Sequence, residues 1–151
     1  MRLRRSMPFP RFVACAVRAG LELARARLFL HSTRPAEVFR RNAQSARAGA
    51  AARSSSPEEA DSHYRHVAAF VSAMAVRVPW RADCLVQAMA AQRWLMRRGL
   101  PSEIVVGAAK HPDGRFEAHA WLLRGEAVLL GGDIDRFEPL LDSAQAALRQ
   151  P

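Results

Sequence analysis

The sequence predicts an α+β fold, because a helical spacing of apolar residues gives way to a strand-like spacing along the chain. Apolar side chains recur every three or four residues as far as residue 98, and every second residue from residue 103 onward. Helices followed by a run of strands favour an α+β arrangement over a parallel alternation. The 151 residues are enough for one hydrophobic core and too few for two ordinary domains. We therefore expect a helical N-terminal extension with a linker over residues 1–55 and one compact domain over residues 56–151.

The N-terminal extension is predicted to contain an amphipathic helix over residues 11–30. Four charged residues would face one side of it, namely Arg18, Glu22, Arg25 and Arg27. The apolar side would comprise Phe12, Val13, Ala16, Val17, Leu21, Leu23, Ala24 and Leu28. A short helical piece is expected over residues 35–39, whereas residues 43–55 lack any large apolar side chain and are typical of a linker.

The compact domain should begin with two helices, each of which has a capping signal. Ser56 is followed three residues later by Glu59, which is the pattern of a capping box. The helix that Ser56 opens should end before Pro79, since the residue before a proline avoids helical angles. Asp83 is a suitable N-cap for the second helix, which is expected over residues 84–98.

Three strands are expected after these helices, over residues 103–108, 116–123 and 127–130. The first turn would lie at residues 111–114 and the second at residues 124–126. The result is a small antiparallel sheet.

The charge of the chain is strongly basic and unevenly distributed. The formal net charge is +9, from 23 basic and 14 acidic residues. Residues 1–56 contain 12 arginines against 2 acidic residues, whereas residues 57–151 contain 11 basic residues against 12 acidic ones. A basic extension beside a nearly neutral domain suits an acidic partner or peripheral contact with an anionic membrane surface. No nucleic-acid partner is expected, because no recognition motif or basic sheet with interleaved aromatic residues is present.

The cysteine count and the hydropathy limit which cellular compartment and which kinds of site the sequence predicts. Cys15 and Cys84 are too few for a disulfide framework, so both are expected to be reduced thiols in a cytoplasmic protein. No apolar run reaches the roughly 18 residues that a membrane span needs. His63 and His66 lie one helical turn apart, but no Cys and His cluster supports them, so no metal site is predicted.

A candidate for nucleophilic catalysis stands at the start of the second helix of the compact domain. Cys84 would lie on the first turn, where unpaired N–H groups and the positive end of the helix dipole favour the thiolate. A buried small hydrophobic residue is the alternative for a lone cysteine. His119, in the run AHAW of the second strand, is the candidate base.

Two carboxylates after the third strand, Asp133 and Asp135, are candidates for orienting the imidazole. With a three-residue turn at residues 124–126, His119 would face Gly131, and Asp133 would lie on the same face at a diagonal position. Asp135 would lie one step further away. A two-residue turn would instead put Asp133 on the opposite face, so the choice between the two carboxylates is open.

Five short motifs occur in order between residues 79 and 133. They are PWRADCL at 79–85, WLMRRGL at 94–100, Gly107, AHAWL at 118–122 and LGGD at 130–133. In this order they resemble the B-type leader peptidases of lasso peptide biosynthesis, within the transglutaminase-like cysteine proteases. The resemblance covers roughly residues 56–142, and the first 55 residues match only in being helical and rich in arginine. It implies a transglutaminase- or papain-like core in which the Cys-bearing helix packs on the small sheet.

The resemblance implies roles for individual residues. Cys84 would be the nucleophile, His119 the base and then the acid for the leaving amine, and Asp133 the group that orients the imidazole, with Asp135 as the alternative.

Two tryptophans have weaker assignments by the same resemblance. Trp80, four residues before Cys84, would help to wall or polarise the oxyanion site, although an aromatic there is more often a packing residue. Trp121 would line the substrate cleft or belong to the core.

The implied activity is proteolysis of a ribosomally made precursor peptide, before a separate lasso cyclase forms the macrolactam. A separate leader-recognition protein would present the leader, and ATP would be used by the cyclase, so no cofactor is expected in this chain. An acyl-enzyme can be resolved by an amine as well as by water, so a transglutaminase-like acyltransferase or amidase is an alternative. A non-catalytic basic scaffold module is a further alternative.

Overall fold

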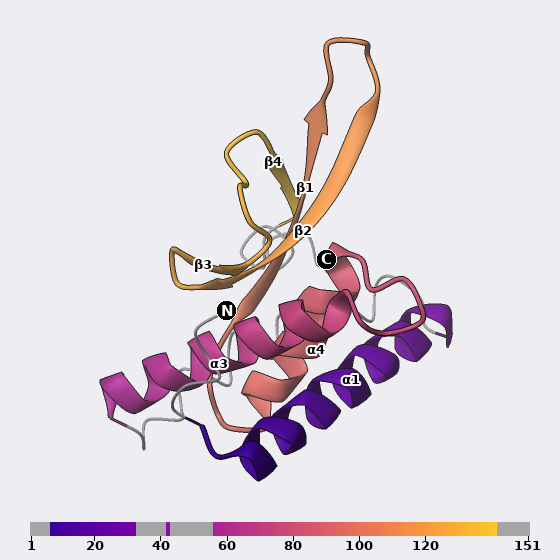
Figure 1. Ribbon diagram of the computed structural model, residues 1–151. Helices are drawn as coiled ribbons and strands as arrows, with labels where there is room; N and C mark the ends of the chain where they lie inside the picture. Colours follow the sequence, from indigo (N-terminus) through magenta and orange to yellow (C-terminus); the bar gives the residue numbers. More distant parts are fainter. Residues whose placement is uncertain (1–6, 33–41, 43–55, 142–151) are drawn as a thin grey trace.

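The computed structural model describes residues 7–32, 42 and 56–141, and it has the predicted α+β fold. Figure 1 shows the helices gathered at one end of the molecule, with a long β-hairpin running past them. The helices and strands are α1 (Phe9–Ser32), α3 (Pro57–Ala75), α4 (Cys84–Met96), β1 (Glu103–Lys110), β2 (Phe116–Arg124), β3 (Ala127–Leu130) and β4 (Glu138–Leu141).

The four strands form one antiparallel sheet in the order β3-β2-β1-β4. The three strands expected from the sequence are present, and β4 is an additional edge strand beside β1. It was missed because it has only four residues and includes Pro139, which lacks the N–H group that a central strand must donate. An edge strand tolerates such a residue.

Both predicted helix caps are confirmed. The Ser56 hydroxyl accepts a hydrogen bond from the Glu59 N–H at 3.3 Å. The Asp83 carboxylate accepts one from the Val86 N–H at 3.2 Å, so α4 begins at Cys84 as expected. Each cap satisfies an N–H group that the helix itself leaves without a partner.

The sheet is covered on both faces by apolar side chains. On one face, Ile104 and Leu122 join the buried residues of the three helices in the main core. On the other face, a smaller cluster is formed by the buried residues Val105, Ala109, Trp121 and Phe137. Neighbouring strand residues point to opposite faces, so β1 and β2 contribute to both clusters.

Helix α1 packs into the main core through a face different from the one predicted. Its buried residues are Ala19, Leu23, Ala26 and, unexpectedly, Glu22, which is 1% exposed. The Glu22 carboxylate lies 3.1 Å from Nε of Arg93 on α4, and this ion pair compensates the buried charge. Four residues assigned to the apolar side are exposed instead, namely Val13, Val17, Leu21 and Leu28.

The rest of the expected extension is described only at residue 42. The helical piece predicted at residues 35–39 and the linker predicted at residues 43–55 lie outside the described residues. The division at residue 56 stays a prediction, and α1 shares its core with α3 and α4.

Asn42 is a buried polar anchor on the sheet. Its side-chain amide donates to the Ile104 carbonyl at 2.7 Å, and its oxygen accepts from the Ile104 N–H at 2.8 Å. The same oxygen accepts from Nε2 of Gln92 on α4 at 2.7 Å. One side chain therefore satisfies both backbone groups of a strand residue and ties them to α4.

Replacing Asn42 with Ala should lower the free energy of unfolding by about 2–4 kcal/mol, because both backbone groups of Ile104 lose their Asn42 partner and Gln92 keeps only its bond to the Ser102 carbonyl. Urea denaturation of the full chain measures the change. Ser32→Ala is the control, since the Ser32 hydroxyl bonds an exposed carbonyl of its own helix, and it should cost less than about 0.5 kcal/mol. Equal effects of the two substitutions would contradict the role of Asn42.

Candidate active site

The Cys84 thiol stands at the N-terminus of α4. Cys84 is the first residue of the helix, is partly buried and is a free cysteine. The Asp83 cap fixes this end of the helix. The sulfur atom therefore lies at the end of the helix where the first N–H groups have no partner within the helix.

The His119 imidazole is held on β2 by a backbone carbonyl. Its Nε2 lies 2.7 Å from the Gly131 oxygen. A carbonyl oxygen only accepts hydrogen bonds, so Nε2 carries the proton. Within the described part of the chain no hydrogen bond reaches Nδ1, which leaves that nitrogen as the basic atom of the neutral ring. The ring also lies beside Phe137 and Trp121, at centroid distances of 4.8 and 6.2 Å.

Gly131 brings its carbonyl to His119 because it has no side chain. A Cβ atom at this position would lie 2.3 Å from Cβ of Trp121, and the φ angle of 123° is one that other residues rarely adopt. The close approach to Trp121 is what places the Gly131 oxygen within reach of the imidazole.

The turn between β2 and β3 differs from the predicted one. Arg124 pairs with Ala127, so the turn has two residues rather than three, and the register shifts again between Leu122 and Leu123. Strand β3 ends at Leu130, so strand pairing does not extend to the carboxylates. His119 still meets Gly131, although through a hydrogen bond beyond the end of the ladder.

Asp133 and Asp135 lie in the exposed segment that follows Gly131. The Asp133 carboxylate accepts a hydrogen bond from the Asp135 N–H at 3.1 Å. Among the residues that the structure describes, no hydrogen bond or ion pair joins either carboxylate to His119. The orienting contact of the imidazole is therefore the Gly131 carbonyl, and the choice between the two carboxylates stays a prediction.

The structure does not join Cys84 to His119. His119 shares a sheet face with Trp121, whereas α4 packs against the face that carries Leu122. For residues 7–32, 42 and 56–141, no hydrogen bond connects the thiol with the imidazole. The two groups lie on elements that contact each other, α4 and β2, but their side chains are not paired.

The two tryptophans near these groups have different environments. The Trp80 indole N–H is buried and has no hydrogen-bond partner among the described residues. Trp121 is 2% exposed and packs in the smaller cluster, where its ring lies over Gly107. A Cβ atom on Gly107 would come within 2.6 Å of that ring. Trp121 is thus a core residue whose ring also flanks His119.

An ionic cluster on the same face was not foreseen. The Glu117 carboxylate lies 3.0 Å from Nε2 of His111 and 2.9 Å from a guanidinium nitrogen of Arg136. The hydrogen bond with His111, aided by the charge of Arg136, holds the pKa of Glu117 below its ordinary value. Glu117 is two residues before His119, and this period-two spacing was the signal in the sequence.

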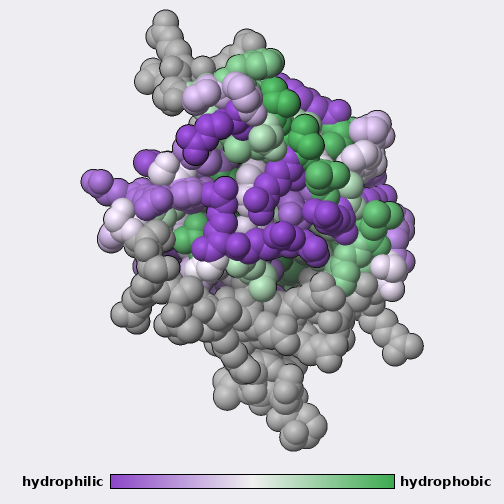
Figure 2. Space-filling view, turned by 90° about the horizontal axis from the view of Figure 1, so that it is seen from below, coloured by the Kyte–Doolittle hydropathy of each residue, from purple (hydrophilic) through white to green (hydrophobic). Residues whose placement is uncertain are grey.

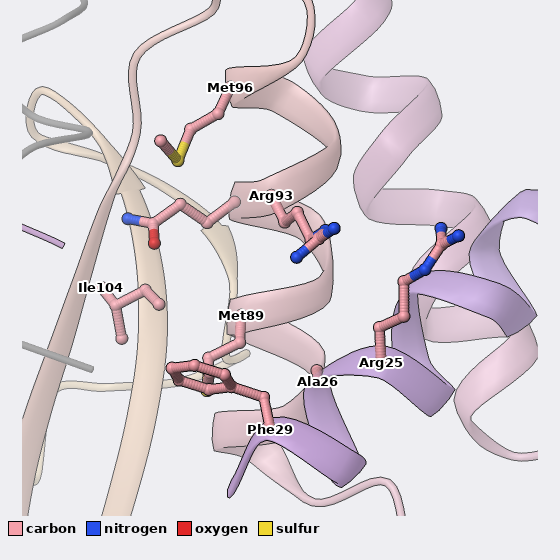
Figure 3. A pocket seen from close by; sticks show the side chains of 8 residues that line it. Arg25, Ala26, Phe29, Met89, Arg93, Met96 and Ile104 are labelled. Atoms are coloured by element: carbon pink, nitrogen blue, oxygen red, sulfur yellow. The ribbon is translucent and has the colours of Figure 1, made fainter. Parts of the chain in front are cut away.

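Other possible binding features are few in the described residues. No group of three His, Cys, Asp or Glu side chains there could hold a metal ion. A hollow of about 160 Å³ opens between α1, α4 and β1, and Figure 3 shows Phe29, Met89 and Met96 around it. It lies along the second half of α4, away from Cys84.

Comparison with known proteins shows the family to which the chain belongs. The family model of the transglutaminase-like superfamily matches residues 20–142, which is most of the chain. No curated protein and no solved structure matched. That superfamily commonly holds cysteine peptidases and acyltransferases. A thiol on the capped start of a helix packed on an antiparallel sheet agrees with this match, and the chain belongs to the transglutaminase-like superfamily.

Proposed function

We propose that this protein is a cysteine peptidase that removes the leader from a lasso peptide precursor. The observation that carries the proposal is the position of Cys84, a partly exposed thiol at the capped first residue of α4, in a chain of the transglutaminase-like superfamily. The motifs around Cys84 and His119, which resemble those of lasso leader peptidases, favour this substrate over other peptides.

The proposed reaction proceeds through a thioester. Nδ1 of His119 takes the proton of the Cys84 thiol, and the resulting thiolate attacks the last leader carbonyl. The negative charge that develops on oxygen is stabilised by the Cys84 N–H and the Trp80 indole N–H. The C–N bond breaks as His119 gives its proton to the leaving amine, which becomes the free N-terminus of the core peptide. Water then attacks the thioester as His119 takes its proton. The C–S bond breaks, the leader is released with a free carboxyl group, and His119 returns the proton to the sulfur atom.

The hydrogen bond of His119 determines which nitrogen takes part. Nε2 is occupied by the Gly131 carbonyl, so Nδ1 must be the atom that faces sulfur. The proposal requires Nδ1 and the thiol to approach when a peptide is bound, because they are not paired in its absence. Since His119 lies on the Trp121 face of the sheet and α4 packs on the other, this approach is a larger change than the tightening of a long hydrogen bond.

The proposed partners follow from the substrate. A single small domain would receive the precursor from a separate leader-recognition protein and pass the freed core peptide to an ATP-using cyclase. The proposed peptidase step itself needs no cofactor, because its nucleophile and base are side chains of this chain. If an amine rather than water resolves the thioester, the protein is an acyltransferase, and the leader product then carries that amine.

Cys84→Ala and His119→Ala should each lower the rate of precursor cleavage by roughly 10³-fold or more, since each removes a group that acts on the reacting bond. Mass spectrometry of a precursor incubated with the recognition protein measures the rate. When an amine is added to the reaction, acyl transfer would be seen as a leader product whose mass includes that amine. Cys15→Ala is the matched control and should cleave normally. Normal cleavage by either the Cys84 variant or the His119 variant would contradict the proposal.

Asp133→Asn should lower kcat/KM for the precursor about threefold, because the exposed carboxylate can stabilise the imidazolium only through its charge, both ring nitrogens being assigned to the Gly131 carbonyl and the thiol. Asp135→Asn, two residues away, is the paired comparison and should have the smaller effect. Steady-state kinetics on both variants decides between the two carboxylates, and a larger loss in the Asp135 variant would reverse the assignment.

Gly131→Ala should lower kcat/KM on the order of 100-fold, because the added Cβ displaces the carbonyl that orients His119. Gly132→Ala is the matched control, since Gly132 also has a positive φ, 67°, but an added Cβ would meet no atom within 4 Å. Thermal unfolding of both variants separates loss of orientation from loss of fold. Equal kinetic losses in the two folded variants would contradict the role of the Gly131 carbonyl.

A further inference from the structure

Helix α1 carries a second apolar face that points to solvent. Its residues, called here the outer row, are all exposed by two fifths or more of their surface. They are Phe9 (71%), Val13 (41%), Val17 (57%), Leu21 (51%) and Leu28 (67%). Spacings of four and seven residues put them on one side of the helix. The opposite side is the one buried in the main core, so α1 is apolar on two faces.

The charges beside the outer row are nearly all positive. Arg11, Arg18, Arg25 and Arg27 lie on α1. The single acidic residue of the helix, Glu22, is buried and lies 3.1 Å from Arg93 and 3.6 Å from Arg25, so it partly offsets Arg25 but neither Arg11 nor Arg27.

The positive charge continues beyond the helix itself. The Arg18 guanidinium lies 5.0 Å from the centre of the Trp94 ring on α4, and partial burial with the charges of Arg98 and Arg97 holds the pKa of Arg18 below its ordinary value. Arg2, Arg4 and Arg5 precede α1 in the sequence. Figure 2, which views the molecule from below Figure 1, shows hydrophobic patches bordering a broad hydrophilic band.

This combination favours one kind of occupant. A nucleic acid would use the arginines but leave the apolar outer row in water. A second copy of the chain would bring arginines against arginines, since the surface of α1 offers no carboxylate. An anionic lipid surface satisfies both features, because acyl chains accept the apolar side chains and lipid phosphates accept the guanidinium groups.

We propose that α1 binds in the plane of an anionic membrane surface, with the outer row in the acyl boundary and its arginines on lipid phosphates. Within the described residues no helix is long and apolar enough to cross a bilayer. A helix that lies in the interface needs only one apolar face and a basic flank. This inference is independent of the proposed peptidase activity.

The test is flotation of the full chain with lipid vesicles. Vesicles of phosphatidylcholine with about one third phosphatidylglycerol should bind at least about tenfold more tightly than phosphatidylcholine alone, and salt should weaken the binding. Val17→Glu combined with Leu21→Glu should reduce the affinity about tenfold or more, because it puts carboxylates against the anionic surface.

Controls separate the outer row from general effects. Phe116→Glu changes an equally exposed apolar residue (75%) on the distal hairpin and should bind vesicles normally. Val17→Ser with Leu21→Ser removes apolar surface without adding charge and should still weaken binding, while circular dichroism verifies the fold. The proposal is overturned if anionic and neutral vesicles bind alike, or if neither binds. It is also overturned if the outer-row variants only convert a dimer to a monomer in light scattering without vesicles.

Discussion

Strand β2 is buried on both faces at its centre, from Ala120 to Leu122, and the alternation of its side chains there governs the arrangement around it. Leu122 is fully buried against the helices, and its neighbour Trp121 is 2% exposed in the cluster on the other face. A shift of one residue in the pairing of β2 would move Leu122 to the face of Trp121 and Trp121 to the face of the helices. The burial of both side chains opposes such a shift. The register is pinned further where the Trp121 ring lies over Gly107, which any side chain on β1 would prevent.

The same alternation of side chains along β2 determines where His119 lies in the candidate site. His119 must share a face with Trp121, and the backbone that approaches Trp121 at Gly131 also supplies the carbonyl that fixes the imidazole. The thiol of Cys84 is placed by a separate cause, the Asp83 cap at the start of α4. The candidate nucleophile and the candidate base are therefore positioned by two independent parts of the fold, and in the proposed reaction a bound peptide would have to bring them together.

Features with a local cause could be predicted from the sequence, and features with a distant cause could not. The Asp83 cap and the start of α4 depend on a few adjacent residues. The burial of Glu22 depends on Arg93, far along the chain, and the role of Asn42 depends on backbone groups at Ile104. Asn42 gives no periodic signal, because it is a single polar residue. At the site, the sequence indicated that His119 would meet Gly131, but not that a backbone oxygen would hold the ring.

Helix α1 shows why the basic extension cannot be treated as an appendage. Ala19, Leu23 and Ala26 belong to the main core, so deleting residues 1–55 would remove core packing along with the arginines. Only surface substitutions can separate the two contributions. The arrangement also orients the protein: Figure 1 shows the β1–β2 hairpin projecting away from α1. A chain bound to lipid through α1 would thus hold the hairpin away from the bilayer, where peptide partners could reach it.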